Sequence, residues 1–144
     1  MINMHIIFEV FVDTNVFVTI RDNTDSTHKK ALKISEYLSK NKIRWATSSD
    51  VIGETLTVIS KKLGKGIALD WYKDFKNSSI REIFIDDKIH NETRKFFAKV
   101  KSKNISFIDC SSVIAMKRNK IKYIFSFDQD FRSMGVKLLG DAVK

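Results

Sequence analysis

The stretch HIIFEVFVDTNVF, residues 5–17, begins with an almost uninterrupted apolar run and changes to polar residues at Asp13. An apolar run of this kind, over residues 5–12, is typical of a strand that is covered on both faces, as in a parallel sheet. Residues 16–20 can then begin a short helix. The stretch therefore predicts a buried strand, followed at once by a turn that carries Asp13 and by a helix.

The rest of the chain continues this alternation of strands and helices. Further strands are expected at residues 43–46, 80–85, 122–127 and 136–139. Helices are expected at residues 28–40, 51–63, 66–76, from the caps Asp86 and Asp87 to about residue 101, and at 107–118, with a short helical turn at 128–134. Helices that separate most of the strands are the pattern of right-handed crossovers over a parallel sheet. The predicted fold is of the α/β class: a three-layer α/β/α domain with a central, mostly parallel sheet of four or five strands.

The composition fits one compact domain over residues 1–144. The chain has no proline, only five glycines, and no repeat, low-complexity tract or linker. Its single cysteine, Cys110, excludes an internal disulfide bond and a cysteine-based zinc site, and we expect it to be a small buried residue. No stretch approaches the roughly 18–20 apolar residues that cross a bilayer, so we expect no membrane partner and a cytoplasmic location.

The chain is strongly basic, with 26 lysines and arginines against 17 acidic residues and a formal net charge of +9. Such an excess favours polyanionic partners, because Lys and Arg near phosphates release counterions and steer association. A solvated cationic surface without such a partner explains the charge equally well. Charge alone leaves both interpretations open.

Four acidic residues fall near the carboxyl ends of the predicted strands, where functional groups gather in open α/β sheets. Asp13 ends the first strand, and Asp128 ends the fourth. Glu54 lies in the first turn of the helix expected after the second strand, and Asp109 in the first turn of the helix that precedes the fourth. The four carboxylates can therefore converge at one edge of the sheet.

Each acid alone also has a purely structural interpretation. Asp13 and Asp128 can be helix N-caps, a position where aspartate is favoured. Asp109 and Glu54, in first helical turns, would be stabilised by the helix dipole. These interpretations explain each residue separately, but they do not explain why all four should lie at the same edge.

A cluster of four carboxylates needs a counter-charge, because like charges a few ångström apart raise one another's pKa. Mg²⁺ and Mn²⁺ prefer oxygen ligands, retain water molecules, and are usually held by one or two carboxylates together with substrate phosphates. Such ions can activate a water molecule and stabilise the leaving oxygen of a phosphodiester. We therefore expect a site for one or two Mg²⁺ or Mn²⁺ ions, with Lys and Arg around it to attract the phosphate backbone.

Four short motifs carry a family resemblance that covers nearly the whole chain. They are FVDTNVF at residues 11–17, SSDVIGE at 48–54, SFIDCSSVIA at 106–115 and SFDQDF at 126–131. No single one is specific, but all four in this order, with the usual intervals, resemble the PIN-domain nucleases found as VapC-type toxins in bacteria and archaea. Cys110 fills the place of the small residue that usually follows the acid of the third motif.

The resemblance implies a role for each matched residue. Asp13 and Asp109 would be the principal metal ligands, and Glu54 and Asp128 would complete the site, directly or through water. The supporting residues would be Thr14, Asn15, Ser126 and Asp130, of which Asn15 and Ser126 would orient the carboxylates or the attacking water. For Asp130, a role behind the first ligands and a simple capping role both remain open.

The resemblance further implies a metal-dependent endoribonuclease that hydrolyses RNA, the toxin component of a type II toxin–antitoxin pair. Its partners would be an RNA substrate, a cognate antitoxin protein and a second copy of the chain in a homodimer. Two alternatives remain open: a housekeeping RNA-processing nuclease, and a non-catalytic RNA-binding module that keeps the fold and the basic surface. Trp71, Tyr72 and Phe75 could form core or dimer contacts, and core is favoured.

Overall fold

A computed structural model describes residues 8–142 of the chain. Within this range five strands form one sheet in the order β3-β2-β1-β4-β5, and all four pairings are parallel. The strands are β1 (Glu9–Val12), β2 (Arg44–Ser48), β3 (Arg81–Ile83), β4 (Tyr123–Phe125) and β5 (Lys137–Leu138). The predicted α/β sheet is confirmed, with the fifth strand present and every pair parallel.

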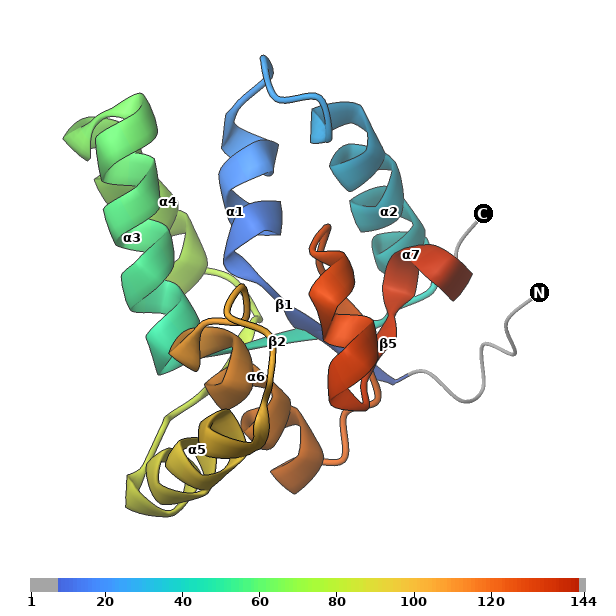
Figure 1. Cartoon of the computed structure of the whole chain (residues 1–144). Helices are drawn as coiled ribbons and strands as arrows, with labels where there is room; N and C mark the ends of the chain where they lie inside the picture. The colour runs from blue at the N-terminus through green and yellow to red at the C-terminus, as the bar shows by residue number, and fades with distance from the viewer. Residues whose placement is uncertain (1–7, 143–144) are drawn as a thin grey trace.

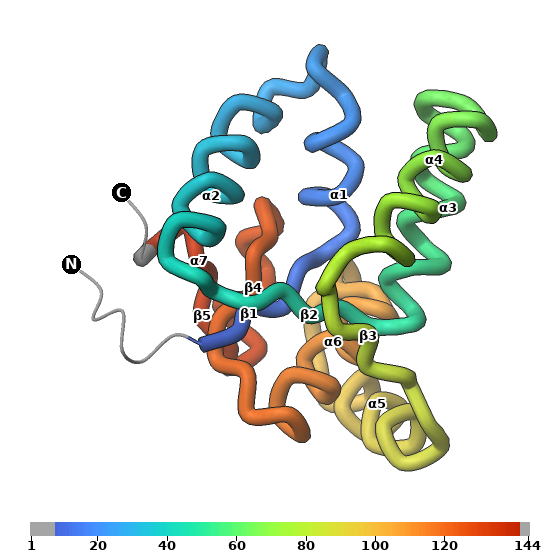
Figure 2. The backbone as a smooth tube through the Cα atoms, turned by 180° about the vertical axis from the view of Figure 1, so that it is seen from behind, coloured from blue at the N-terminus to red at the C-terminus, as the bar shows by residue number. Residues whose placement is uncertain are grey.

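Helices connect the strands and cover both faces of the sheet. They are α1 (Thr14–Arg21), α2 (His28–Lys40), α3 (Ser49–Leu63), α4 (Lys65–Lys76), α5 (Asp87–Lys99), α6 (Phe107–Arg118), the 3₁₀ helix η2 (Gln129–Met134) and α7 (Leu139–Ala142). Helices α1 and α2 lie on one side of the sheet, and α5 and α6 lie on the other (Figure 1), an arrangement that the reverse view also shows (Figure 2). The predicted three-layer architecture is confirmed.

The centre of the sheet is buried because helices pack on both of its faces. Val10, Phe11 and Val12 of β1 have no exposed surface, which explains the apolar residues directly before Asp13. Trp71 and Phe75 of α4 are buried against the core, with Trp71 in edge contact with Phe17 at a ring distance of 5.2 Å. The core interpretation of these two aromatic residues is confirmed, as is the burial of Cys110. Tyr72, by contrast, is 38% exposed.

Several predicted boundaries differ from the structure. The predicted first strand began at residue 5, and the part before residue 8 lies outside the described residues. The strands at 80–85 and 122–127 are shorter than predicted, and α7 was not predicted. The helix expected from residue 51 begins at Ser49, because the Ser48 hydroxyl accepts the backbone N–H of Val51 and caps it. Glu54 therefore lies in the second turn of α3, so the prediction that it sits in the first turn is wrong.

The strand register brings the first and fourth motifs together. Val12 of β1 pairs with Phe125 of β4, and the backbone N–H of Asp13 donates to the carbonyl of Phe125 over 3.1 Å. Asp13 directly follows Val12, and Ser126 directly follows Phe125, so these two residues lie side by side at the carboxyl ends of the strands. Strand β1 lies between β2 and β4 in the sheet. The chain runs from β1 to β2 and β3 on one side of it, and then crosses to β4 and β5 on the other side, so the strand order reverses at β1. Such a switch point is where open α/β sheets place their binding crevice.

Candidate active site

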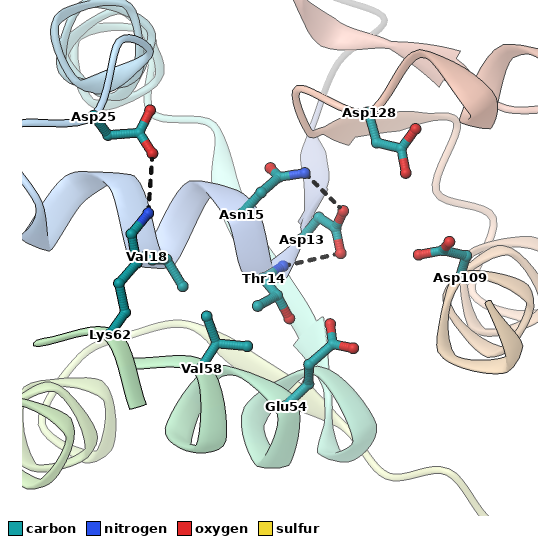
Figure 3. Close-up of a pocket in the computed structure, with 10 residues that line it drawn as sticks. All are labelled: Asp13, Thr14, Asn15, Val18, Asp25, Glu54, Val58, Lys62, Asp109 and Asp128. Carbon is teal, nitrogen blue, oxygen red and sulfur yellow. Dashed lines mark hydrogen bonds and ion pairs between the residues drawn. The ribbon is translucent and has the colours of Figure 1, made fainter. Parts of the chain in front are cut away.

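All four predicted acids line one pocket of about 310 Å³ (Figure 3). Asp13 follows β1, Glu54 comes from α3, Asp109 from α6, and Asp128 from the turn before η2. Thr14 and Asn15 line the same pocket, together with residues farther along α1 and α3. The structure thus brings together acids from four separate segments of the chain.

Asp13 is the most buried of the four acids, with only 5% of its surface exposed. It caps α1: its Oδ1 accepts the backbone N–H of Thr14 over 2.9 Å. Its Oδ2 accepts from the Ser126 hydroxyl at 2.9 Å and from the Asn15 side-chain amide at 3.3 Å. Because a carboxylate oxygen has two lone pairs, Oδ1 keeps one acceptor position for a further partner.

Asn15 and Ser126 connect Asp13 to the loop that carries Asp128. The Asn15 amide donates to the Ser126 hydroxyl over 3.0 Å, and its carbonyl oxygen accepts the backbone N–H of Phe127 at 3.2 Å. The backbone N–H of Asp128 donates to the Ser126 hydroxyl over 3.1 Å. These bonds fix the turn after β4 relative to the buried carboxylate, so Asp128 is held near Asp13.

Asp109 and Asp128 each use one oxygen to cap a helix. Asp109 forms a capping box with Ser106: the backbone N–H of Ser106 donates to Asp109 Oδ2, and the backbone N–H of Asp109 donates to the Ser106 hydroxyl, both over 3.0 Å. Asp128 Oδ1 accepts the backbone N–H of Asp130 at 2.9 Å. The other oxygen of each carboxylate has no such bond within residues 8–142. The structural and functional interpretations of these acids are therefore compatible.

Two contacts between helices set where Glu54 and Asp109 lie. Thr14 of α1 is within 3.3 Å of the Thr55 hydroxyl of α3, next to Glu54 in the chain. The Ser111 hydroxyl of α6 lies 2.9 Å from a carboxylate oxygen of Asp50 on α3. Buried polar contacts of this kind tie α1, α3 and α6 together at the level of the pocket.

Burial and neighbouring negative charges raise the pKa of two of the acids, Asp13 and Asp109. The pKa of Asp13 is raised from 3.8 to about 7, mainly by burial and to a smaller extent by the nearby charges of Asp109 and Glu54, against the hydrogen bonds from Ser126 and Thr14. Burial also raises the pKa of Asp109, with smaller contributions from Asp128 and Glu54. No lysine or arginine forms an ion pair with any of the four acids in the described part of the chain. The cluster thus carries negative charge without a compensating side chain.

The residues fit a hard divalent cation. Every ionisable group near Asp13 in the pocket is a carboxylate, and no His or Cys lines it. Within residues 8–142, no three His, Cys, Asp or Glu side chains are arranged as a ready-made metal site. The carboxylate lining suits an ion such as Mg²⁺, which is usually held by one or two carboxylates and keeps several water molecules.

Sequence reasoning missed the far end of the pocket. Val18, Asp25, Val58 and Lys62 also line it, whereas the predicted supporting residue Asp130 does not. A signal was present in the helix period: Val58 and Lys62 follow Glu54 at intervals of four residues, so all three lie on one face of α3.

Comparisons with known proteins agree with this fold. A family model described as the PIN domain matches residues 10–137. The ribonuclease VapC1 of Aquifex aeolicus is 31% identical over 131 residues, which are 91% of this chain and 89% of that protein. The 23S rRNA-specific endonuclease VapC20 of Mycobacterium tuberculosis is 24% identical over 88% of this chain and 94% of that protein.

Two solved structures share the fold. The crystal structure of Mycobacterium tuberculosis VapC20, described as a toxin that cleaves the sarcin–ricin loop, matches with a TM-score of 0.77 at 24% identity, covering 88% of this chain and 95% of that one. VapBC2 from Rickettsia felis, bound to a DNA fragment from their promoter, matches with a TM-score of 0.64 at 19% identity, covering 90% and 96%. At these identities the two structures support the fold alone.

Proposed function

The chain belongs to the PIN-domain family and is a ribonuclease of the VapC type, and on this premise we propose that its four carboxylates hold Mg²⁺ or Mn²⁺ for the hydrolysis of RNA phosphodiester bonds. The observation that carries the proposal is the pocket itself, where Glu54, Asp109 and Asp128 lie around the buried Asp13 without a cationic partner. A nuclease site of this composition requires a cation, because an acidic pocket by itself repels a phosphate.

We assign Asp13 and Asp109 as the principal ligands of one or two ions, with Glu54 and Asp128 binding directly or through water. Asp13 Oδ1, Asp109 Oδ1 and Asp128 Oδ2 are the atoms that remain available beside the hydrogen bonds within residues 8–142. When bound, the cation would lower the pKa of a water molecule and stabilise the negative charge that develops on the phosphate.

The other residues would hold this arrangement in place. Asn15 and Ser126 keep Asp13 Oδ2 occupied, so the carboxylate presents Oδ1 to the pocket. The Thr14 backbone N–H fixes the orientation of the same group. Cation binding would release the proton that burial holds on Asp13 near neutral pH, which makes metal affinity depend on pH.

The biological role proposed is that of a toxin restrained by an antitoxin protein, supported by the likeness to the VapC relatives. A homodimer and a cytoplasmic location remain predictions. No helix within residues 8–142 is long and apolar enough to cross a membrane. Growth arrest on expression, relieved by a neighbouring small gene, would separate a toxin from a housekeeping nuclease.

The test is cleavage of a single-stranded RNA with and without Mn²⁺ or Mg²⁺. Wild-type protein should cut only with the cation, and Asp13→Asn and Asp109→Asn should each lose at least about a hundredfold in rate. Asp70→Asn is the matched control, because Asp70 is an exposed aspartate on α4 away from the pocket. Cation-independent cleavage, or full activity of Asp13→Asn, would overturn the proposal, and binding without cleavage would favour a non-catalytic module.

A further inference from the structure

The pocket extends beyond the acids into a groove between α1 and α3. Val58 and Lys62 follow Glu54 on one face of α3, and each step of four residues advances about 6 Å along a helix. Val18 follows Thr14 on α1 at the same interval, and α1 packs against α3. Figure 3 shows Val18 and Val58 between the carboxylates at one end and Lys62 with Asp25 at the other.

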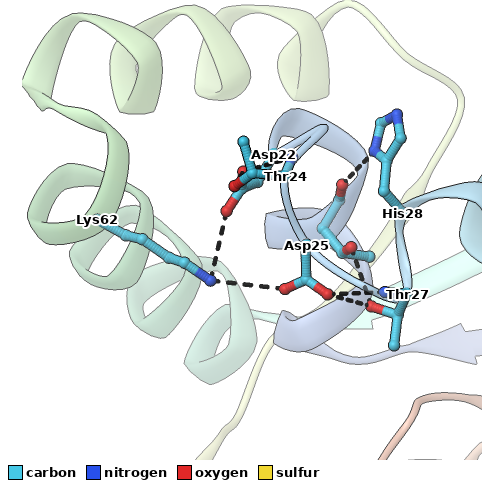
Figure 4. Close-up of polar contacts among 7 residues, drawn as sticks. Asp22, Thr24, Asp25, Thr27, His28 and Lys62 are labelled. Carbon is cyan, nitrogen blue, oxygen red and sulfur yellow. Dashed lines mark hydrogen bonds and ion pairs between the residues drawn. The ribbon is translucent and has the colours of Figure 1, made fainter.

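The far end of this groove is a preorganised polar cluster (Figure 4). Asp22 Oδ1 accepts from the backbone N–H and the hydroxyl of Thr24 at 3.1 and 2.6 Å, and Asp25 Oδ1 accepts from the same groups of Thr27 at 2.9 and 2.7 Å. These bonds leave Oδ2 of both aspartates for the Lys62 ammonium, at 3.4 and 3.5 Å. The ammonium, still 48% exposed on its side chain, has three N–H groups, so one remains for a ligand.

The chemistry of the groove favours a nucleobase over a phosphate. One lysine between two aspartates gives the far end a net negative charge, which disfavours an anion. The middle is apolar, since Val18 and Val58 form it, and it suits the flat face of a base. The Lys62 ammonium can donate to a ring nitrogen or carbonyl of a base, and Asp25 Oδ2 can accept from an amino or imino group beside it.

We propose that this groove is the binding subsite for the nucleobase next to the scissile phosphate, with the base face on Val18 and Val58 and its polar edge on Lys62 and Asp25. The proposal rests on the proposed function, because it places the scissile phosphate at the four acids. It makes Lys62 and Asp25 determinants of sequence specificity. Since a bidentate contact to a base edge discriminates between bases by about 1–3 kcal/mol, the wild-type preference at this position should be roughly five- to 150-fold.

The main test maps cleavage sites in a randomised pool of single-stranded RNA by sequencing the product ends. Wild-type protein should prefer certain bases at one position beside the cut, and Lys62→Met, which keeps an apolar stem and removes the ammonium, should reduce that preference at least fivefold. Lys61→Met, on the same turn but not lining the pocket, should keep the wild-type preference. Asp74→Asn should keep it as well: it breaks the Arg21–Asp74 ion pair between helices outside the pocket and so controls for a merely structural loss.

A second measurement separates this inference from the nuclease proposal. Methyl NMR of Val18 and Val58 is recorded during titration with the four uncharged ribonucleosides, which need no metal ion. The subsite is supported if a nucleoside causes chemical-shift changes in the methyl groups of both valines, and if Lys62→Met weakens these changes while Lys61→Met does not. This holds even if the protein cuts no RNA. If RNA is cut but the base preference survives Lys62→Met, or if no nucleoside shifts either valine, the subsite is wrong and the nuclease proposal stands.

Discussion

Asp13 makes the stability of the metal-free protein depend on pH in an unusual direction. Its pKa is about 7 in the folded protein, against 3.8 for an ordinary aspartate. Between these two values the folded protein keeps a proton that the unfolded chain has released. Stability that comes from this group is therefore fully present below about pH 4 and is lost as the pH rises to about 7.

The size of the effect follows from the difference in pKa. Each unit of difference corresponds to about 1.4 kcal/mol, so a rise of roughly three units removes on the order of 4 kcal/mol of unfolding free energy between pH 4 and pH 7. Above pH 7 the contribution of this group becomes constant. A loss of this size is a large share of the 5–15 kcal/mol that is usual for a folded domain.

Urea unfolding of metal-free protein in EDTA, at a series of pH values from 4 to 8, measures this loss. The informative quantity is the difference in unfolding free energy between wild type and Asp13→Asn at each pH. The amide of Asn does not titrate, and the contributions of all other titrating groups cancel in the difference. Relative to wild type, Asp13→Asn should gain stability with rising pH, with a total change on the order of 4 kcal/mol. Asp70→Asn, the exposed control on α4, should follow the wild-type curve at every pH.

Parallel pH curves for wild type and Asp13→Asn would show that Asp13 has an ordinary pKa, and the reasoning from burial and like charges would then be wrong. If wild type instead gained stability relative to Asp13→Asn as the pH rises, the pKa of Asp13 would be lowered and not raised, which would refute the reasoning outright. Addition of Mn²⁺ at pH 7.5 provides a further check. A cation that binds the folded state should restore stability to wild type and leave Asp13→Asn unchanged.

Other changes have equally direct outcomes. Asp109→Asn should lower the pKa of Asp13, because it removes a neighbouring negative charge. The loss of unfolding free energy measured in urea should then be complete at a lower pH than in wild type. Ser126→Ala should raise that pKa, because it removes a hydrogen bond to the charged form, and should weaken Mn²⁺ binding measured by calorimetry. Phe131→Ala should lower the unfolding free energy in urea by about 3–5 kcal/mol, since Phe131 is fully buried in the core. Lys120→Gly should raise the thermal midpoint, with a gain of up to about 1 kcal/mol, because Lys120 has a φ of 56° that favours glycine.

The fold could be predicted from the sequence because most of its strands and helices carry their own local signals. The apolar run before Asp13 indicates a strand buried on both faces, and the structure leaves no exposed surface on Val10, Phe11 or Val12. Ser106 is a suitable N-cap, and the helix after it was predicted with its observed bounds. Local signals of this kind can be recognised without knowledge of the tertiary contacts.

The errors have physical causes. Ser48, Ser49 and Asp50 are all suitable N-caps, so the sequence could not tell which one begins α3, and Glu54 was placed one turn too early. Strand β3 pairs over only three residues, whereas the apolar pattern continues on both sides of it. The helix α7 has four residues and includes Gly140, so no helical period could develop.

The parts of the candidate site that belong to sequence motifs could be predicted. The parts that are formed only by tertiary contacts could not. The four acids were found because strand ends in an α/β sheet share one edge. That Ser126 would touch Asp13 depends on the register between β1 and β4, which pairs Val12 with Phe125. The helix period places Val58 and Lys62 on the same face of α3 as Glu54, but it does not show that α1 packs beside that face to form the groove.

A crystal of the protein soaked in Mn²⁺ tests the central claim most directly. Anomalous scattering from the ion should give a peak in the pocket, in contact with an oxygen of Asp13 and near Asp109, and the peak should be absent from Asp13→Asn crystals treated in the same way. If the pocket shows no peak at saturating Mn²⁺, or the only peak lies away from the four carboxylates, the proposed metal site is contradicted.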